Sequence, residues 1–309
     1  MALPAIRDVR RHFSGETIIL GARPSIAPVF RAVPDIDRLI VLNRGNEPSQ
    51  ITGDIGIILP NSFRSAWILR KAGIKERWGY RTDFRRPLLT RSVPKPRRRV
   101  SFPEYYSNLV RRLGIETGPL TAHLKAPPAS TAAAMTLLEE RGWNRATPLV
   151  GIAPGAAFGH AKRWSPKRYA ELASQLSETG ATCVILGRSE DRDAAHDIKG
   201  LDLIGQTDLT MLMGVLSHCD VVVANDSGAL HLAGALGTPV VGIWGPTHER
   251  YSTPVTPYED SRTVAALSES VFCRPCFLAD CPIDHRCMKR IPTERVHQAV
   301  RRFLQEAQA

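Results

Sequence analysis

The sequence predicts an α/β protein made of two domains, each containing a Rossmann-like parallel sheet. Short runs rich in β-branched residues alternate with amphipathic segments, which is the pattern of parallel βαβ units. The length of 309 residues suits two ordinary domains, and a hydrophobic content of 43% is that of a folded globular chain. We expect the first domain at 1–148 and the second at 149–309, with the final helix, 293–305, free to pack back on the first domain.

The first half opens with a helix. Leu3–Phe13 has a helical pattern, whereas a doubly wound domain begins with its central strand and the loop after it. We therefore expect the first strand to be missing from this chain. The remaining pattern predicts strands at Thr17–Leu20, Arg38–Leu42 and Ile55–Leu59, and helices at Pro24–Ala32, Ser62–Ala72, Glu104–Leu113 and Thr131–Arg141.

The second half is more regular. Four strands separated by crossover helices predict a Rossmann-like sheet of about 130 residues, a normal domain size. The strands are expected at Leu149–Ala153, Cys183–Gly187, Val221–Ala224 and Val240–Trp244. The helices are expected at Pro166–Glu178, Asp191–Ile198, Leu209–Ser217, Ala229–Leu236 and Thr293–Gln305.

The charge and the composition limit the kinds of binding partner that we expect. Lys and Arg number 41 against 30 Asp and Glu, a net charge of +11 that favours an anionic partner. Aromatic residues make up only 6% and do not interleave with basic ones, which argues against nucleic acid. The sequence shows neither an apolar run long enough for a membrane span nor a secretory signal, so we expect a cytoplasmic protein.

The most informative segment is Val221–Ala233, where a buried strand runs through a polar turn into a helix. Ligands of open α/β sheets collect at the carboxyl ends of strands, and a helix N-terminus there attracts phosphate. Asp226 and Ser227 could simply cap the helix. Capping alone does not explain the string Asp-Ser-Gly-x-x-His, which ends at His231, so we favour ligand binding, with Gly228 allowing close approach.

A second strand-to-helix loop, Ala153–Pro166, contains Gly155, Gly159 and Lys162. Its small residues could lay backbone amides along a diphosphate, and Lys162 could neutralise a leaving phosphate. The spacing matches neither a Walker A loop nor a dinucleotide glycine motif. A third strand end, Leu186–Asp191, places a carboxylate where dinucleotide folds bind ribose, although acidic residues are favoured in a first helical turn anyway.

Together these strand ends resemble the ADP-heptose:lipopolysaccharide heptosyltransferases, glycosyltransferase family 9. The matching motifs are Pro-Gly-Ala-x-Phe-Gly-x-Ala-Lys-Arg-Trp at 154–164, Asn-Asp-Ser-Gly-x-x-His-Leu-Ala at 225–233 and Trp-Gly-Pro-Thr at 244–247. Segments 59–66 and 85–90 resemble the family's acceptor domain, and the Cys-Pro-rich tail is most like heptosyltransferase II. The resemblance implies a GT-B fold, with two Rossmann-like domains facing across a cleft. It also implies inverting transfer of heptose from ADP-heptose to the lipopolysaccharide inner core, with no required cofactor.

The resemblance also implies roles for individual residues. It makes Lys162 and Asp226 catalytic, Lys162 contacting the diphosphate and Asp226 the heptose hydroxyls. The other expected donor-binding residues are Gly155, Ala157, Phe158, Asp191 at the ribose, Thr207 near the adenine, Ser227, Gly228 and His231. Ala157 and Phe158 replace hydroxyl residues of heptosyltransferase I, so contacts there must come from backbone amides. Acceptor contacts are expected from Asn61, Ser62, Arg64 and Arg85.

The family's general base is an Asp in a Gly-Asp pair just before the segment that resembles Met1–Arg7, and this chain begins after that pair. Either the working protein starts further upstream or this chain turns its donor over poorly. A non-catalytic nucleotide-sugar-binding homologue, or a family member with another donor or acceptor, stays an alternative.

Four cysteines lie close together in the sequence, as Cys273-x2-Cys276-x4-Cys281-x5-Cys287. They could hold zinc or an iron–sulfur cluster, but the spacing of the second pair and the family's metal-free chemistry favour reduced thiols. Cys183 and Cys219 are predicted to be buried structural thiols. The basic residues of the first domain favour peripheral, salt-sensitive contact with the cytoplasmic face of the inner membrane, where an anionic glycolipid acceptor would be presented.

Overall fold

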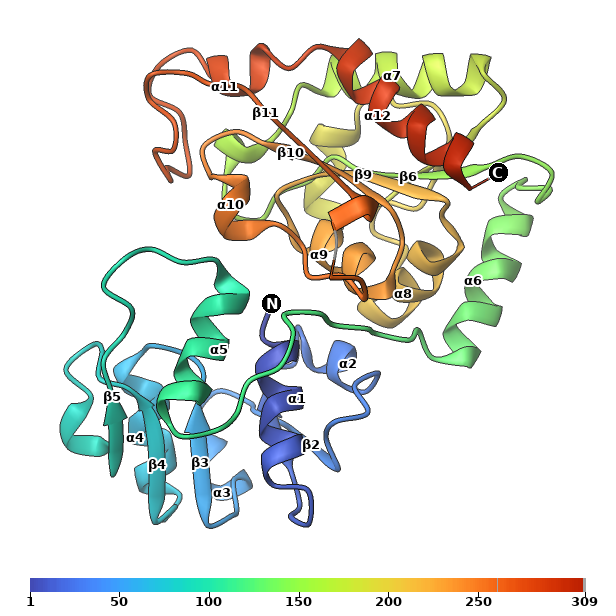
Figure 1. Ribbon diagram of the computed structural model, residues 1–309. Coiled ribbons are helices and arrows are strands. Elements are labelled where there is room, and N and C mark those ends of the chain that lie inside the picture. The colour runs from blue at the N-terminus through green and yellow to red at the C-terminus, as the bar shows by residue number, and fades with distance from the viewer. Residues whose placement is uncertain (260, 308–309) are drawn as a thin grey trace. The chain divides into compact units, whose positions relative to one another are not determined.

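The computed structural model describes residues 1–259 and 261–307, which form two compact units divided between Thr121 and Ala122. The last two residues of the expected second domain, 308 and 309, lie outside the described part. Both units are built of helices around parallel strands (Figure 1), which confirms the predicted α/β class. Within the described residues, no helix is both long and apolar enough to cross a bilayer.

The sheet of unit 2 has the doubly wound order. Its strands are hydrogen-bonded in the order β11-β10-β9-β6-β7-β8, and every pairing is parallel. This order reverses direction between β6 and β9, which is the switch point where such sheets bind ligands. The strands are β6 (Leu149–Ala153), β7 (Thr182–Ile185), β8 (Leu201–Asp202), β9 (Val221–Asn225), β10 (Val240–Trp244) and β11 (Val264–Ser268).

The three central strands, β6, β9 and β10, are fully buried along their length. Their near-continuous apolar sequence follows from this, because a parallel sheet covered on both faces has no solvent side. The helices of unit 2 are α6 (Pro128–Glu140), α7 (Pro166–Glu178), α8 (Leu209–His218), α9 (Gly228–Leu236), α10 (Glu249–Ser252), α11 (Arg286–Lys289) and α12 (Thr293–Glu306), with short 3-10 turns η2 (His160–Lys162), η3 (Ser189–Ala195) and η4 (Ser261–Thr263). The α-helix expected at Asp191–Ile198 is therefore the 3-10 turn η3.

The last helix, α12, belongs to the core of unit 2. Val296, Val300 and Phe303 are spaced along one face and are buried beside the central strands and α7. This periodicity of three to four residues is that of a helix covering a sheet. The apolar face of this helix is therefore covered by its own unit.

The division between the units lies upstream of the boundary we expected near Thr147–Leu149. The reason is α6, which packs against α8 of unit 2. Gly214 makes the close crossing possible, because a Cβ there would lie 2.3 Å from the carbonyl oxygen of Ser130. The chain before α6 is tied to the same unit, since Leu124 donates its N–H to the carbonyl of Ala235.

The strands of unit 1 fall in two parallel sheets, β1-β2 and β3-β4-β5. The strands are β1 (Ile19–Ala22), β2 (Arg38–Val41), β3 (Ile55–Ile58), β4 (Glu76–Tyr80) and β5 (Arg91–Val93).

Helices cover both faces of the three-stranded sheet. Ile57 packs with α1 and α5, whereas its neighbour Ile58 packs with Ala66 of α4, because successive strand residues point to opposite faces. The expected helix Pro24–Ala32 is reduced to one turn. The helices of unit 1 are α1 (Leu3–His12), α2 (Ala27–Phe30), α3 (Glu47–Gln50), α4 (Phe63–Lys71) and α5 (Phe102–Arg112), with the 3-10 turn η1 (Arg86–Leu88).

Candidate functional site

The loop between β6 and α7, residues Pro154–Ser165, meets the end of β9 at the switch point of unit 2. Asn225, fully buried at the end of β9, holds both ends of this β6–α7 loop. Its side-chain amide donates to the carbonyl of Pro154 at 2.7 Å, and its Oδ1 accepts the Trp164 N–H at 3.0 Å. The two motifs of the sequence are therefore joined by a buried side chain.

Asp226 follows directly and is the centre of a polar cluster. Lys162 Nζ lies 2.7 Å from Asp226 Oδ2, and the Thr247 hydroxyl donates to the same oxygen at 2.7 Å. His231 Nε2 lies 3.5 Å from Oδ1. Burial alone would raise the pKa of the Asp226 carboxyl, but these neighbours hold it well below its usual range, so Asp226 is a carboxylate at neutral pH.

The cluster lies at the N-terminus of α9, which begins at Gly228. Ser227 occupies the capping position, yet its side chain makes no capping bond. Within the described residues, the buried Ser227 Oγ and His231 Nδ1 have no hydrogen-bond partner. Unpaired buried polar atoms are costly, and together with the free first amides of a helix they suit an anionic ligand. A Cβ on Gly228 would meet nothing within 4 Å, so the approach to this end is open.

The pKa of His231 also departs from its ordinary value. Burial lowers its pKa, against the raising effect of the Asp226 carboxylate. At neutral pH it is therefore an uncharged imidazole, able to donate from one ring nitrogen and accept at the other.

Two further candidate residues, Ala157 and Phe158, lie in the β6–α7 loop. Ala157 and Phe158 are exposed, and the Phe158 ring centroid is 5.3 Å from Lys162 Nζ, a cation–π contact that restrains the lysine. Gly159 has φ +135°, and a Cβ there would lie 2.3 Å from the carbonyl oxygen of Ala279. Only glycine fits this position, so the loop is pressed onto the segment that carries the four clustered cysteines.

Residues 51–286 match the sequence profile of glycosyltransferase family 9 (heptosyltransferase). This chain belongs to that family. The lipopolysaccharide heptosyltransferase 2 of Salmonella typhimurium is 31% identical over 83% of this chain and 82% of its own length. The enzyme of the same name from Escherichia coli is 31% identical over 66% of this chain and 63% of its own length, so that alignment spans less than two thirds of the relative.

Solved structures of the family agree in fold. E. coli ADP-heptose lps heptosyltransferase II superposes with a TM-score of 0.83, covering 100% of this chain and 95% of that chain at 24% identity. A glycosyltransferase family 9 structure from Veillonella parvula gives 0.82, covering 99% and 93% at 21% identity. The predicted family and its GT-B fold class are thereby confirmed.

Asp191, expected at the ribose, is buried beneath the β6–α7 loop of this family 9 chain. Its carboxylate accepts the Arg188 N–H at 3.1 Å and lies 3.4 Å from Arg163. A Cβ on Gly155 would lie 2.3 Å from the Asp191 carboxyl carbon, so the glycine is required for the loop to lie on this side chain. Thr207 is half-buried between β8 and α8.

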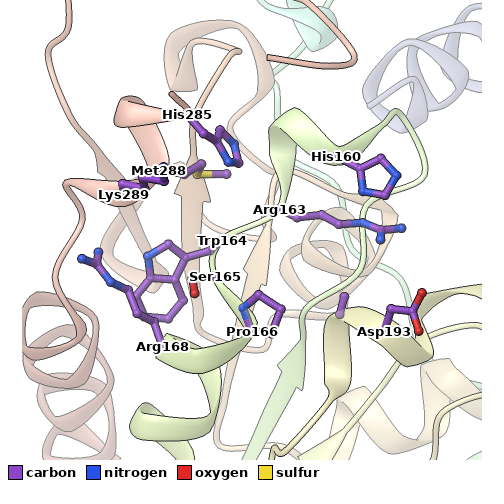
Figure 2. Close-up of a pocket in the computed structure, with 11 residues that line it drawn as sticks. His160, Arg163, Trp164, Ser165, Pro166, Arg168, Asp193, His285, Met288 and Lys289 are labelled. Atoms are coloured by element: carbon purple, nitrogen blue, oxygen red, sulfur yellow. The ribbon is translucent and has the colours of Figure 1, made fainter. Parts of the chain in front are cut away.

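A cavity of about 440 Å³ opens beside the same loop, at the start of α7 (Figure 2). Figure 2 shows Trp164 and Arg168 on one side of Pro166, and His160, Arg163 and Asp193 on the other. None of Lys162, Asp226 and His231 lines it. The cavity is therefore adjacent to the polar cluster and distinct from it.

The expected acceptor residues of unit 1 gather where β3 and β4 end. Ser62 caps α4 by accepting the Ser65 N–H, and Asn61 Oδ1 accepts the Tyr105 hydroxyl at 2.8 Å. Arg64 pairs with Glu47 at 2.8 Å, and this hydrogen bond lowers the pKa of Glu47 to about 2. These side chains are thus largely engaged within the unit.

Arg85 differs from the expectation. It is 0% exposed, and its guanidinium donates to the carbonyls of Tyr80, Pro60 and Ser62. Direct contact with an acceptor is excluded by this burial. In the structure Arg85 instead holds the β3–α4 loop in place.

Sequence reasoning did not assign Thr247 and Asn225 to the site. Both lie at carboxyl ends of central strands, β10 and β9, within motifs that the sequence had singled out. Applying the strand-end rule to every polar residue after a buried strand would have found them.

The four clustered cysteines, in the segment 273–287, are all free thiols. Cys287 is buried, Cys273, Cys276 and Cys281 are half-buried, and no disulfide joins them. Across residues 1–259 and 261–307, no group of three or more His, Cys, Asp or Glu side chains is arranged to hold a metal ion. Cys183 and Cys219 are buried as expected, and burial raises the pKa of Cys183 to about 12.

Proposed function

We propose that this chain is an inverting heptosyltransferase that moves heptose from ADP-heptose to the inner core of lipopolysaccharide. The observation that supports it best is the meeting of Lys162 and Asp226 at the switch point of unit 2, beside the N-terminus of α9. Family membership gives the reaction class. The names of the relatives, heptosyltransferase 2, give the sugar and the type of acceptor.

The chemistry requires charge to be stabilised on both sides of one bond. The bond between heptose C1 and the diphosphate oxygen breaks, its electron pair leaves with ADP, and C1 gains positive character as the acceptor hydroxyl forms the new bond. Lys162 and the first N–H groups of α9 stabilise the leaving diphosphate. Lys162 acts without rearrangement, because Asp226 already holds its ammonium group and Asn225 holds the loop that carries it.

Asp226 has a separate task on the sugar side. As a carboxylate it accepts hydrogen bonds from heptose hydroxyls and faces the positive charge that develops at C1. Ser227 and His231, each with an unpaired buried atom, contact the phosphates. Asp191 and Thr207 serve the ribose and adenine. The acceptor hydroxyl must pass its proton to a base, and we assign that task to none of the described residues.

No cofactor enters the proposal, since side chains and a helix N-terminus supply the charges. Transfer is therefore expected to survive exhaustive treatment with a chelator. Stoichiometric zinc or iron in the purified protein, with activity lost on its removal, would contradict this.

The acceptor is proposed to bind unit 1 through Asn61, Ser62 and Arg64, with Arg85 shaping the loop beneath them. Exposed cations of this unit, among them Arg81, Arg86 and Arg97, would attract the phosphates of a glycolipid presented at the cytoplasmic face of the inner membrane. Contact with the membrane would then be peripheral.

The test is a transfer assay with purified protein, labelled ADP-heptose and inner-core acceptors that lack heptose. Transfer to one defined acceptor, with inversion at C1, supports the proposal. Donor binding without transfer to any acceptor would indicate a non-catalytic nucleotide-sugar-binding homologue. Transfer from another nucleotide sugar in preference to ADP-heptose would indicate a different donor.

A further inference from the structure

One face of α4 in unit 1 carries aromatic side chains that stay in contact with solvent. Phe63, Trp67 and Lys71 are spaced four residues apart, so they form a single row along the helix. Phe63 is 45% exposed and Trp67 39%, and Lys71 Nζ lies 5.0 Å from the Trp67 ring centroid. The other side of α4 is buried through Ala66. The outward face of this helix is thus aromatic where a surface helix is normally polar.

Phe84, in the loop between β4 and η1, extends this surface. It is 95% exposed and has φ +54°, a left-handed conformation that is uncommon for a bulky residue. The preceding Asp83 accepts the Phe63 N–H at 2.6 Å, and this bond ties the turn to the start of α4. Phe63, Trp67, Lys71 and Phe84 therefore form one surface, which we call the aromatic row.

The charge around the aromatic row is positive. Arg70, Arg81 and Arg86, its neighbours in the sequence, are exposed. Glu47 is paired with Arg64, so the exposed carboxylate of Asp83, which accepts the Phe63 N–H, stands against Lys71 and these three arginines. Exposed aromatic side chains flanked by arginine and lysine are typical of surfaces that bind at the boundary between lipid headgroups and acyl chains.

We propose that the aromatic row docks unit 1 on an anionic lipid bilayer. Phe84 and Trp67 enter the headgroup boundary, while Lys71, Arg70, Arg81 and Arg86 bind lipid phosphates. The proposal rests on the proposed function, whose acceptor is a lipid-anchored sugar. A second copy of the chain fits less well, because a two-fold contact would place like charges against each other.

The test is flotation of the full chain with vesicles that contain no acceptor. Vesicles of phosphatidylethanolamine and phosphatidylglycerol should carry the protein, and vesicles of phosphatidylcholine should carry much less. The double variant Trp67→Ser, Phe84→Ser should partition about tenfold or more weakly, because it removes two large apolar side chains. Phe272→Ser, which removes an aromatic side chain 78% exposed in unit 2, should bind as the wild type does.

Fluorescence locates the contact independently of affinity. Anionic vesicles should shift the wild-type tryptophan emission to shorter wavelength, and Trp67→Phe should float normally with that shift lost. Unchanged thermal unfolding of the double variant excludes misfolding. The proposal is overturned if the double variant floats like the wild type, or if the row instead mediates a dimer that the substitutions dissociate.

Activity separates this proposal from the proposed function. With a deacylated, water-soluble acceptor the double variant should transfer heptose at the wild-type rate, and with acceptor embedded in vesicles it should be about tenfold slower or more. A wild-type protein that floats but transfers to no acceptor contradicts the proposed function alone. Equal losses with both acceptors would contradict the docking role.

Discussion

Lys162 Nζ lies 2.7 Å from Asp226 Oδ2, across the point where the strand order of unit 2 reverses. The two residues are 64 positions apart in the sequence, and the contact joins the loop after β6 to the end of β9. A lysine that neutralises a departing diphosphate must be positioned before the bond breaks. The Asp226 carboxylate provides this, because it is held in its charged form and fixes the ammonium group beside α9.

Replacing Lys162 should affect turnover more than donor binding. Lys162→Ala removes a charge that acts mainly on the developing diphosphate, so kcat should fall by about 10²–10³. Lys162→Arg keeps the charge with a different shape and should retain more activity. Lys167→Ala, an exposed lysine of α7, serves as the control. A kcat for Lys162→Ala within a factor of about three of the wild type would refute the assignment.

Asp226 should make stability depend on pH in the acidic range. Its folded-state pKa lies below that of an unfolded aspartate, which is about 3.9, so its contribution is complete above that value and is lost as pH falls through the folded pKa. Below about pH 4, where His231 no longer titrates in the unfolded chain, the difference in unfolding free energy between the wild type and Asp226→Asn should shrink as the pH falls. Urea unfolding across this range measures it. A difference that grows as the pH falls below about 4 would have the wrong sign.

Thr247 should act through Asp226. Thr247→Val keeps the shape but removes the hydrogen bond to Oδ2, so ADP-heptose affinity should fall about tenfold, the effect of losing one hydrogen bond to a charged group. Thr247→Ser retains the hydroxyl and should restore most of the affinity. Equal loss in both variants would show that Thr247 matters for packing instead.

Two glycines of the site should respond differently to alanine. Gly155→Ala would bring a methyl group to 2.3 Å from the Asp191 carboxyl carbon, so Tm should fall by several degrees as the loop is displaced. Gly228→Ala meets open space, so Tm should stay within about two degrees while donor affinity falls, because the methyl group projects into the approach to α9. Melting curves and donor titrations on both variants test these predictions. A clear fall in the Tm of Gly228→Ala would contradict an open site.

The sequence predicted unit 2 well because its central strands are fully buried. β6 and β10 are continuous apolar runs, β9 is apolar up to Asn225, and the strands found for Leu149–Ala153 and Val240–Trp244 have the predicted bounds. Strand β4 was missed because it contains Glu76 and Arg77, which partner Thr90 and nearby carbonyls at the exposed end of the strand. Such pairing is a tertiary effect that a hydrophobic pattern does not contain.

The candidate site was predicted in its parts but not in its connections. Lys162, Asp226 and His231 were assigned from their motifs, and the structure brings them together. The hydrogen bond from Thr247 could not be predicted, because it depends on β10 lying next to β9. For Arg85 the motif suggested a binding residue, but the structure shows a buried side chain that supports a loop. Burial of a charged side chain after a strand cannot be predicted from its position in a motif.

Calorimetric titration of ADP-heptose into the full chain tests the central claim most directly. The account predicts one donor site per chain, with Asp226→Ala binding about tenfold or more weakly, because a charged hydrogen-bonding group at the sugar is lost. Equal affinity in the wild type and the variant would place the donor elsewhere. An absence of binding to the wild type would contradict the account as a whole.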